Sequence, residues 1–432
     1  MKKTFIALAA IATLASCCCN KKSDYSALKL DPANFEKVID GKQVQLFTIE
    51  NDNMAVQFTN YGARMTSLIV PDRNGEYKDV IWGFDSIDGY LNSQDHFAGP
   101  VVGRFANRIA EGKFSIDGVE YNVVTNEGPN QLHGGPKGYY ACVWDGKTGI
   151  NEKGEPVMEF HILSPDGDQG FPGNLEAWVT YTLTKDNALV INYKAVTDKA
   201  TPVNLTFHPY LNLHGTTEKS SNSHKLMIPA DGFTPCGPGL IPTGEIQSVE
   251  GTVNDFRQPT EIGSRAKEEG YDLNFVLGTQ GKQCCKSECG KYALAAVMAE
   301  PETGIKLEVF TDKPGIQFYS GPAMNGKDVG KRGQIFHRFS GVALETQDFP
   351  DAPNHANFPN TILRPGETYT HNAVFKFSVC DKCKGDKNCG EKHECKDGKK
   401  CGEKHDCGEK HGDCCKDGKK ACDDKPCDKC EK

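Results

Sequence analysis

The chain has 432 residues, enough for one large domain or two ordinary ones with a sizeable core. Its net charge is −8, and no basic stretch is interleaved with aromatic residues, which excludes a typical nucleic-acid-binding protein. Gly, Pro, Asn, Asp and Thr are abundant, and short extended runs broken by these turn residues indicate a largely β protein.

The first residues have the pattern of a bacterial export signal. Met1-Lys2-Lys3 gives a positive start, and the apolar run 5–15 is too short to span a bilayer as a mature helix. Small residues precede Cys17, as in the bacterial lipobox, in which cleavage leaves a lipid-modified cysteine. We expect residues 1–16 to be a lipoprotein signal peptide and residues 17–34 to be the lipidated N-terminus and a tether; an ordinary signal with a chance cysteine is the alternative. The protein would then be lipid-anchored in the cell envelope on the periplasmic side, in an oxidising space.

Between residues 35 and 379 the sequence predicts paired strands. The runs 54–61 and 64–70 predict a hairpin, as do 177–183 and 188–195 around a turn at 185–187. The runs 306–310 and 315–319 repeat this pattern. No strand–helix alternation of the βαβ type occurs, so we expect one all-β domain, a large antiparallel β-sandwich of many strands.

Cysteine is unevenly distributed. Of 19 cysteines, three lie at 17–19 and eleven between Cys380 and Cys430, and the body between them is long enough to fold without disulfides. Residues 380–432 repeat CGEKH and CKDGKK, have almost no apolar residues, and are expected to be disordered. Their Cys and His could bind a soft metal ion such as zinc or copper(I), although the spacing fits no closed zinc finger. A flexible redox-active tail is the alternative, and the Cys284–Cys289 loop has a similar composition.

Polar side chains that suit acid–base chemistry are embedded in the body. They lie in the motifs GRFANRI (103–109), NQLHGG (130–135), NLTFHPYLNLHG (204–215), YDLNF (271–275) and LETQDF (344–349). No GxSxG, P-loop, HExxH or dinucleotide fingerprint is present, so nucleophilic, phosphoryl and hydride chemistry lack support. Each motif alone is a weak signal, but His, Asp, Glu, Arg and Asn on separate elements suit acid–base work on a polar neutral ligand.

Together with DKPGIQFYSG (312–321), the continuation of LETQDF to residue 359, and LRPGETY (363–369), these motifs resemble the aldose 1-epimerase, or galactose mutarotase, family. The motifs occur in the family's order, and the resemblance covers nearly everything from Phe35 to Phe377. It implies a β-sandwich of the galactose-mutarotase type. It also implies interconversion of the α and β anomers of free aldohexoses such as galactose and glucose, with no cofactor and no metal. The partner would be a monosaccharide substrate, and a monomer is the expected state.

The resemblance also implies roles for individual residues. Glu345 would be the general base that takes a proton from the C1 hydroxyl, and His208 the general acid that gives one to the ring oxygen. Glu345 would start ionised and His208 protonated, with the nearby carboxylate keeping the imidazolium charged. The residues expected to bind the sugar are Asn107, Arg108, His133, Asp272 and Gln317. Arg104 is expected to be structural, and Phe318 and Tyr319 are expected to belong to the core or the pocket wall.

Two histidines lie six residues apart in the motif at 204–215. They could form a metal-binding pair, but nothing in the resemblance requires an ion there. We therefore interpret His208 as the acid, supported by Asn204 and Tyr210, and His214 as a turn residue before Gly215.

Three alternatives to a free-hexose epimerase remain open. The body could be a non-catalytic carbohydrate-binding lipoprotein, or a scaffold for metal handling by the tail. An enzyme acting on sugar 6-phosphates is disfavoured because no extra basic cluster lies near the motifs. Leu211 and Leu273 stand where relatives often carry an aromatic residue and a histidine, which leaves the preferred hexose in question.

Overall fold

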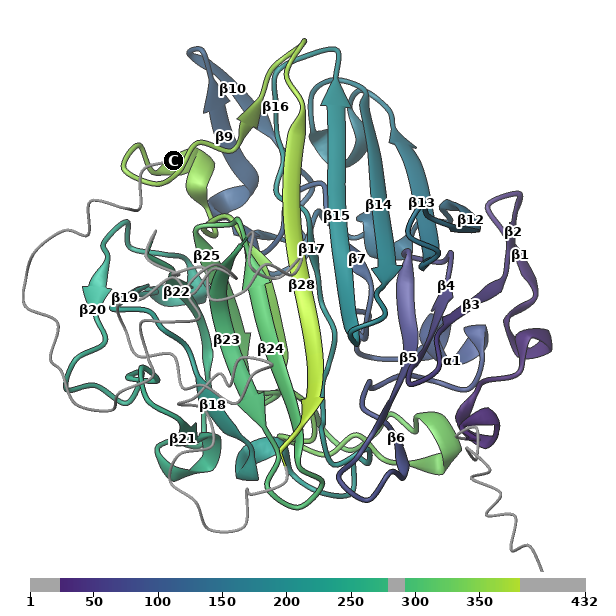
Figure 1. Cartoon of the computed structure of the whole chain (residues 1–432). Helices are drawn as coiled ribbons and strands as arrows, with labels where there is room; N and C mark the ends of the chain where they lie inside the picture. Colours follow the sequence, from purple (N-terminus) through teal and green to yellow (C-terminus); the bar gives the residue numbers. More distant parts are fainter. Residues whose placement is uncertain (1–23, 279–291, 381–432) are drawn as a thin grey trace, which may run out of the picture.

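The structure, a computed structural model, describes residues 24–278 and 292–380, in which antiparallel strands dominate (Figure 1). Its largest sheet has nine strands and forms the broad face in Figure 1. In spatial order these are β12 (Asp145–Ile150), β13 (Pro156–Ser164), β14 (Leu175–Leu183), β15 (Ala188–Thr197), β28 (Tyr369–Val379), β24 (Ile305–Thr311), β23 (Ala293–Ala299), β18 (Lys225–Met227) and β21 (Thr260–Glu261).

Two smaller sheets lie against this one. A five-stranded sheet has the order β20 (Gln247–Ser248), β19 (Gly232–Thr234), β22 (Asp272–Val276), β25 (Gly315–Tyr319) and β26 (Ala343–Gln347). A four-stranded sheet runs β3 (Leu46–Glu50), β4 (Ala55–Thr59), β5 (Arg64–Pro71) and β6 (Tyr77–Asp79). All the strand pairs in these sheets are antiparallel.

Short two-stranded pairs complete the described part of the fold. They are β1 (Lys37–Ile39) with β2 (Lys42–Val44), β7 (Val101–Val102) with β17 (Thr206–Phe207), β8 (Arg108–Ile109) with β11 (Gln131–Leu132), β9 (Lys113–Ile116) with β10 (Val119–Asn122), and β16 (Thr201–Pro202) with β27 (Ile362–Leu363). The α-helix in the described ranges, α1, has six residues (Ile87–Asn92), and Ser86 caps its N-terminus by accepting from the Gly89 N–H.

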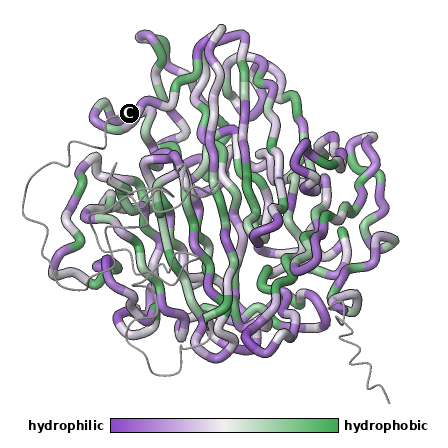
Figure 2. Tube along the Cα trace, in the orientation of Figure 1, coloured by the Kyte–Doolittle hydropathy of each residue, from purple (hydrophilic) through white to green (hydrophobic). Residues whose placement is uncertain are grey.

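The core lies between the sheets. Along β14 every second side chain is buried, as expected for a strand with one face on a core and one toward water. Figure 2 shows the same alternation of hydrophobic and hydrophilic residues along the long strands. Tyr181 of β14 packs on Phe58 of β4, with ring centroids 4.6 Å apart, and Phe207 of β17 packs on Phe375 of β28 at 6.2 Å. The expected all-β antiparallel sandwich is therefore confirmed.

Two of the three predicted hairpins are confirmed, and the third is wrong. β4 pairs with β5 and β14 with β15, but β24 and β25 belong to different sheets. β24 pairs with β23 and β28, whereas β25 pairs with β22 and β26. The residues between them form a corner that carries the chain from one layer to the other. Period-2 patterning identifies a strand but says nothing about its partner, which explains the error.

Several expectations fall on residues that the structure does not describe. The signal peptide, Cys17, the Cys284–Cys289 loop and the tail from residue 381 lie outside the described residues. The last part of the expected tether is described, and it lies against the body: Leu30 is buried, and its N–H donates to Gln57 Oε1 at 2.7 Å. In the described ranges no helix has the length and apolar character needed to cross a membrane.

Candidate active site

A cavity of about 580 Å³ opens at one end of the five-stranded sheet. Of the seven residues expected to act on or bind the sugar, six line it: Asn107, Arg108, His133, His208, Asp272 and Glu345. The seventh, Gln317, lies behind Asp272 and donates from Nε2 to Asp272 Oδ1 at 2.6 Å. The structure thus brings residues from five separate sequence motifs to one cavity, and it places Gln317 behind one of the residues that line it.

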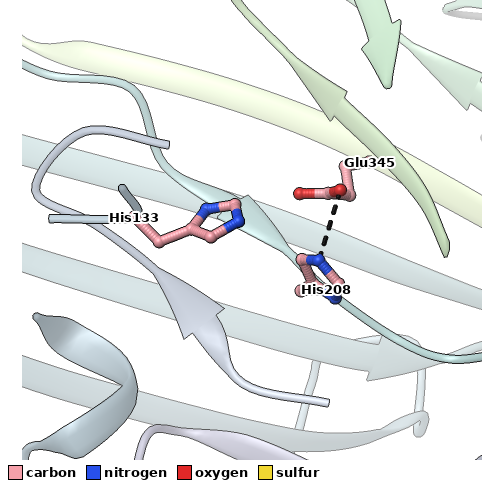
Figure 3. Close-up of side chains that lie close together, drawn as sticks. All are labelled: His133, His208 and Glu345. Carbon is pink, nitrogen blue, oxygen red and sulfur yellow. Dashed lines mark ion pairs between the residues drawn. The ribbon is translucent and has the colours of Figure 1, made fainter. Parts of the chain in front are cut away.

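His208 and Glu345 form the centre of this cavity (Figure 3). Glu345 is in β26, and His208 directly follows β17. Thr206 of β17 donates its hydroxyl to the Thr346 carbonyl of β26 at 2.8 Å, which ties the two strands together. As a result His208 Nε2 lies 3.5 Å from Glu345 Oε1, and both side chains are almost completely buried. Glu345 Oε2 has no hydrogen-bond partner among the described residues, which leaves this buried carboxylate with unused hydrogen-bonding capacity.

His133 lies beside this pair because β8 and β11 bring its loop next to Asn107. The His133 N–H donates to the Asn107 carbonyl at 3.0 Å, and the Asn107 N–H donates to His133 Nδ1 at 3.1 Å. Gly134 follows with a φ of +86°, and a Cβ there would lie 2.0 Å from the Gly103 carbonyl oxygen, so only glycine fits. Since Nδ1 accepts a hydrogen bond, the neutral ring carries its proton on Nε2. His133 therefore offers the cavity a hydrogen-bond donor.

Arg108 and Asp272 form the polar wall. Arg108 makes a two-point contact with Glu127, from Nε to Oε2 at 2.5 Å and from Nη2 to Oε1 at 2.7 Å, and its Nη1 lies 3.9 Å from Asp272 Oδ2. This fork holds the guanidinium in a fixed plane. Sequence analysis did not identify Glu127. The one sequence feature that could have indicated it is its position three residues before the NQLHGG motif.

Burial changes the pKa values of the central pair. It raises the pKa of Glu345 well above its ordinary value, and the charge of Asp272 adds to this. Burial also lowers the pKa of His208 to about 4. Both pKa shifts run against the expected starting state, an ionised Glu345 and a protonated His208, because desolvation penalises the charged form of both groups.

Known proteins are similar to this chain in sequence and in fold. The model of the family described as aldose 1-epimerase matches residues 45–376. This chain belongs to the aldose 1-epimerase family. A galactose mutarotase from Bos taurus is 44% identical over 340 residues, which are 78% of this chain and 94% of that protein. The aldose 1-epimerase of Escherichia coli K12 is 38% identical over 349 residues, 78% of this chain and 96% of that one.

A solved structure supports membership of the same family. The GalM/aldose epimerase homologue from C. elegans is 31% identical, with a TM-score of 0.70, and the match covers 78% of this chain and all of that one. This chain is thus an isomerase of the aldose 1-epimerase family with the family's β-sandwich.

In this site, His133, His208 and Glu345 resemble a set of metal ligands. Ligand atoms of His133, His208 and Glu345 all lie within 4.8 Å of one another. However, the proton on His133 Nε2 makes that nitrogen a donor, and a metal ion would need its lone pair. The site is therefore built to hydrogen-bond a polar ligand. His214, interpreted from the sequence as a turn residue and not as a metal ligand, lies in a separate cluster, where the Gly215 N–H closes a turn on the Asn212 carbonyl.

The supports of His208 differ from expectation. The ring of Tyr210 lies 5.0 Å from that of His208, and the Tyr210 hydroxyl donates to Asp95 Oδ2 at 2.8 Å. Asn204 instead exchanges two hydrogen bonds with the backbone of Asp348, so it stabilises the strand end.

Three further expectations can be compared with the structure. Arg104 is structural as expected, since its buried guanidinium donates to the carbonyls of Pro172 and Gly173. Phe318 is in the core and Tyr319 lines the cavity. The two departures, Leu211 and Leu273, pack on the apolar core and are not among the residues that line the cavity.

Proposed function

We propose that this protein interconverts the α and β anomers of free aldohexoses such as galactose and glucose, with Glu345 and His208 as the proton-transfer groups. The observation that supports this most directly is the buried His208–Glu345 pair, 3.5 Å apart, facing a cavity lined by Arg108, Asp272 and His133. The names of the similar proteins agree with it, since they are a galactose mutarotase and an aldose 1-epimerase.

Ring opening needs two proton transfers. The Glu345 carboxylate takes the proton of the C1 hydroxyl, the O1 electron pair forms the C1=O double bond, and the C1–O5 bond breaks. His208 gives its Nε2 proton to O5, which becomes the C5 hydroxyl. After rotation about C1–C2, O5 attacks the other face of the aldehyde, Glu345 returns a proton to O1, and His208 recovers one from O5. Each positioned transfer contributes roughly 10²–10⁴-fold.

The directions of the two pKa shifts favour the protonation state reached in the middle of this cycle. Opening leaves Glu345 protonated and His208 neutral, and burial favours this same state without sugar. In this proposal the site favours the open-chain aldehyde, and the hydroxyls of a bound sugar supply hydrogen bonds that favour the charged pair. Stabilising the high-energy species more than the substrate is what accelerates a reaction.

The other residues orient the ring. Arg108 and His133 Nε2 donate to sugar oxygens, and Asp272 accepts from a hydroxyl. Asn107 fixes the tautomer of His133 through its backbone N–H, and Gln317 positions Asp272.

Polarimetry tests this function. Freshly dissolved α-D-galactose or α-D-glucose should reach anomeric equilibrium faster with the protein than without it. Glu345→Gln and His208→Asn should each remove most of that acceleration. Wild-type rates in both variants would overturn the assignment of roles, and no acceleration by the wild-type protein would overturn the function.

We also propose, from the sequence of the first 17 residues, that the mature protein is lipid-anchored in the cell envelope through Cys17. Expression in a bacterium with a labelled fatty acid should label the wild-type chain, and Cys17→Ala should release the protein from the membrane fraction. Labelling of the variant would contradict the anchor.

The C-terminal tail is a separate proposal. Its repeated Cys and His support binding of a soft metal ion, and the enzyme body is proposed to act as a monomer. Titrating zinc or copper(I) into the full chain and into a chain ending at Val379 should show uptake only by the former. Equal uptake would exclude a role of the tail, and sedimentation of the shorter chain tests its oligomeric state.

A further inference from the structure

A buried histidine of the nine-stranded sheet, His371 of β28, lies close to the active site without lining the cavity. Its side chain is completely buried. Its ring stacks on that of Tyr193, the opposite residue of β15, with centroids 4.6 Å apart and an interplanar angle of 9°. This packing fixes the plane of the His371 ring, and both ring nitrogens then meet polar partners on other elements of the fold.

Each ring nitrogen of His371 contacts one of the two segments that carry the proposed catalytic pair. Nδ1 lies 3.0 Å from the carbonyl oxygen of Leu205, three residues before His208. Nε2 lies 2.9 Å from the hydroxyl of Thr346, which directly follows Glu345 in β26. Because neighbouring side chains of a strand point to opposite faces, Thr346 contacts His371 on the side of β26 opposite to Glu345. One rigid ring therefore connects the two segments.

The directions of these hydrogen bonds are fixed. A carbonyl oxygen only accepts, so Nδ1 of His371 carries a proton and donates it to Leu205. Burial lowers the pKa of His371 well below its ordinary value, so the ring is neutral and Nε2 accepts. The Thr346 hydroxyl is its donor at 2.9 Å. The other nearby hydroxyl, that of Thr311, lies 3.4 Å from Nε2 and donates to the Asn372 carbonyl at 2.9 Å.

We propose that His371 is a positioning residue, which holds the segment of His208 and the strand of Glu345 at their observed separation. It acts through Leu205 and Thr346, so it touches neither the sugar nor the reacting atoms. The inference rests on the proposed function. A hydroxyl–carbonyl bond between β17 and β26 joins the same segments at one point, and His371 adds a contact from a third strand. A misplacement of reacting groups by about 1 Å can cost roughly 10²-fold in rate, so this contact supports catalysis.

The hydroxyl of Thr346 can be replaced by a methyl group of similar volume, which tests the contact without opening the core. Thr346→Val should lower kcat for mutarotation of α-D-galactose by roughly 10- to 100-fold. KM should stay near wild type, because the residues proposed to orient the sugar lie on other elements. Thr346→Ser keeps the hydroxyl and should restore most of kcat. The matched control is Thr311→Val, the same change at the other hydroxyl near His371, on the strand β24 that carries no proposed catalytic group; it should leave kcat near wild type.

Initial rates from polarimetry at several sugar concentrations separate kcat from KM. A wild-type kcat in Thr346→Val, an equal loss in Thr311→Val, or a loss that falls on KM instead of kcat would each overturn the positioning role and leave the proposed function intact. If the wild-type protein does not accelerate mutarotation, the proposed function fails, and the positioning role with it.

A change of His371 itself gives a second test. In His371→Asn the shorter amide places a nitrogen near the position of Nδ1, which keeps a donor for Leu205 and removes the acceptor for Thr346. Its kcat should fall as far as that of Thr346→Val, and the double variant should fall no further, because both changes remove the same contact. Melting curves check that each variant is folded at the assay temperature, and the Thr346 series decides the question if His371→Asn does not fold. Losses that multiply in the double variant would overturn the proposal.

Discussion

Two histidine–carboxylate pairs, from histidines six residues apart in the chain, lie at the same distance. His208 Nε2 is 3.5 Å from Glu345 Oε1, and His214 Nδ1 is 3.5 Å from Glu300 Oε2. All four side chains are buried, and each histidine lies next to another, His133 in the first case and His224 in the second. By distance and burial alone the two pairs could not be told apart.

Their surroundings separate them. Glu300 accepts the N–H groups of Glu302 and Thr303, at 2.9 and 2.6 Å, and His214 Nε2 lies 2.9 Å from Ser223 Oγ. Glu345 lines the cavity, and its Oε2 has no partner among the described residues. A carboxylate held by backbone donors stabilises a turn, whereas one with unused capacity beside a cavity can exchange a proton with a ligand. An unpaired carboxylate oxygen in a residue that lines the cavity, not the pair itself, marks the site.

The most direct test of this difference between the two pairs is to make the same substitution in both. His208→Asn removes the group that serves the ring oxygen, so kcat for glucose mutarotation should fall by roughly 10²–10⁴-fold with little change in melting temperature. His214→Asn removes a packed ring and its contacts to Ser223 and Glu300, so it should lower the melting temperature by a few degrees and leave kcat near wild type. Polarimetry and thermal unfolding measure both; a loss of kcat in His214→Asn would show that the comparison is wrong.

A smaller loss is expected when the polar wall is altered. Asp272→Asn keeps the shape but removes the acceptor charge facing Arg108, and a hydrogen bond to a charged group contributes about 1.5–3 kcal/mol. The kcat/KM for galactose should therefore fall by about 10- to 100-fold. The control is Glu302→Gln, at an exposed acid beside the second pair that contacts Lys219, and it should not change kcat/KM. A wild-type value for Asp272→Asn would remove Asp272 from the sugar site.

The pH dependence of kcat/KM tests the pKa shifts of His208 and Glu345. In the proposed mechanism the His208–Glu345 pair is active when it holds one proton in total. With two protons neither residue can act as a base, and with none neither can act as an acid. Since the pKa of His208 is lowered to about 4, kcat/KM should hold steady as the pH falls through 6.5 and decline only near pH 4. The raised pKa of Glu345 sets the alkaline limb, which Asp272→Asn should move to lower pH by removing a repelling charge. After subtraction of the uncatalysed rate, an acid limb near 6.5 would contradict this arrangement.

Local sequence patterns predicted the strands better than their partners. The alternation in β14 and β15 and the turn between them gave the correct hairpin, while β24 and β25 were paired wrongly because the partner depends on contacts far away in the chain. The site residues were found through whole motifs that resemble a family, since a single His or Glu in a β protein carries little information.

What the sequence could not predict depends on burial and on loops without chemical signals. Desolvation shifts the pKa values of His208 and Glu345 against their expected protonation, and no local pattern reveals how far a strand end is buried. The cavity is also lined by Trp82, by the segment around Asp95 and by the loop around Asp328, which lie far apart in the chain. None of these segments resembled a motif, so only the fold brings them together.

The smallest expected effect concerns the stability of the two acids. The pKa of Glu345 is raised in the folded state, so the folded chain binds more protons than the unfolded chain from pH 4.5 up to that raised value. Stability contributed by Glu345 is therefore lost as the pH rises through this window. Glu345→Gln cannot titrate, and its melting temperature should exceed that of wild type by a few degrees at pH 8 and by less at pH 5, although the variant should lose most of its activity.

The matched change in the other pair should have the opposite sign. Glu300→Gln weakens the acceptor of two backbone N–H groups in a tight turn, so it should lower the melting temperature while mutarotation persists. Melting curves of both variants at pH 5 and pH 8 decide the matter. If Glu345→Gln gains nothing over wild type as the pH rises, then Glu345 is ionised in the empty site, and the proton of the pair lies on His208.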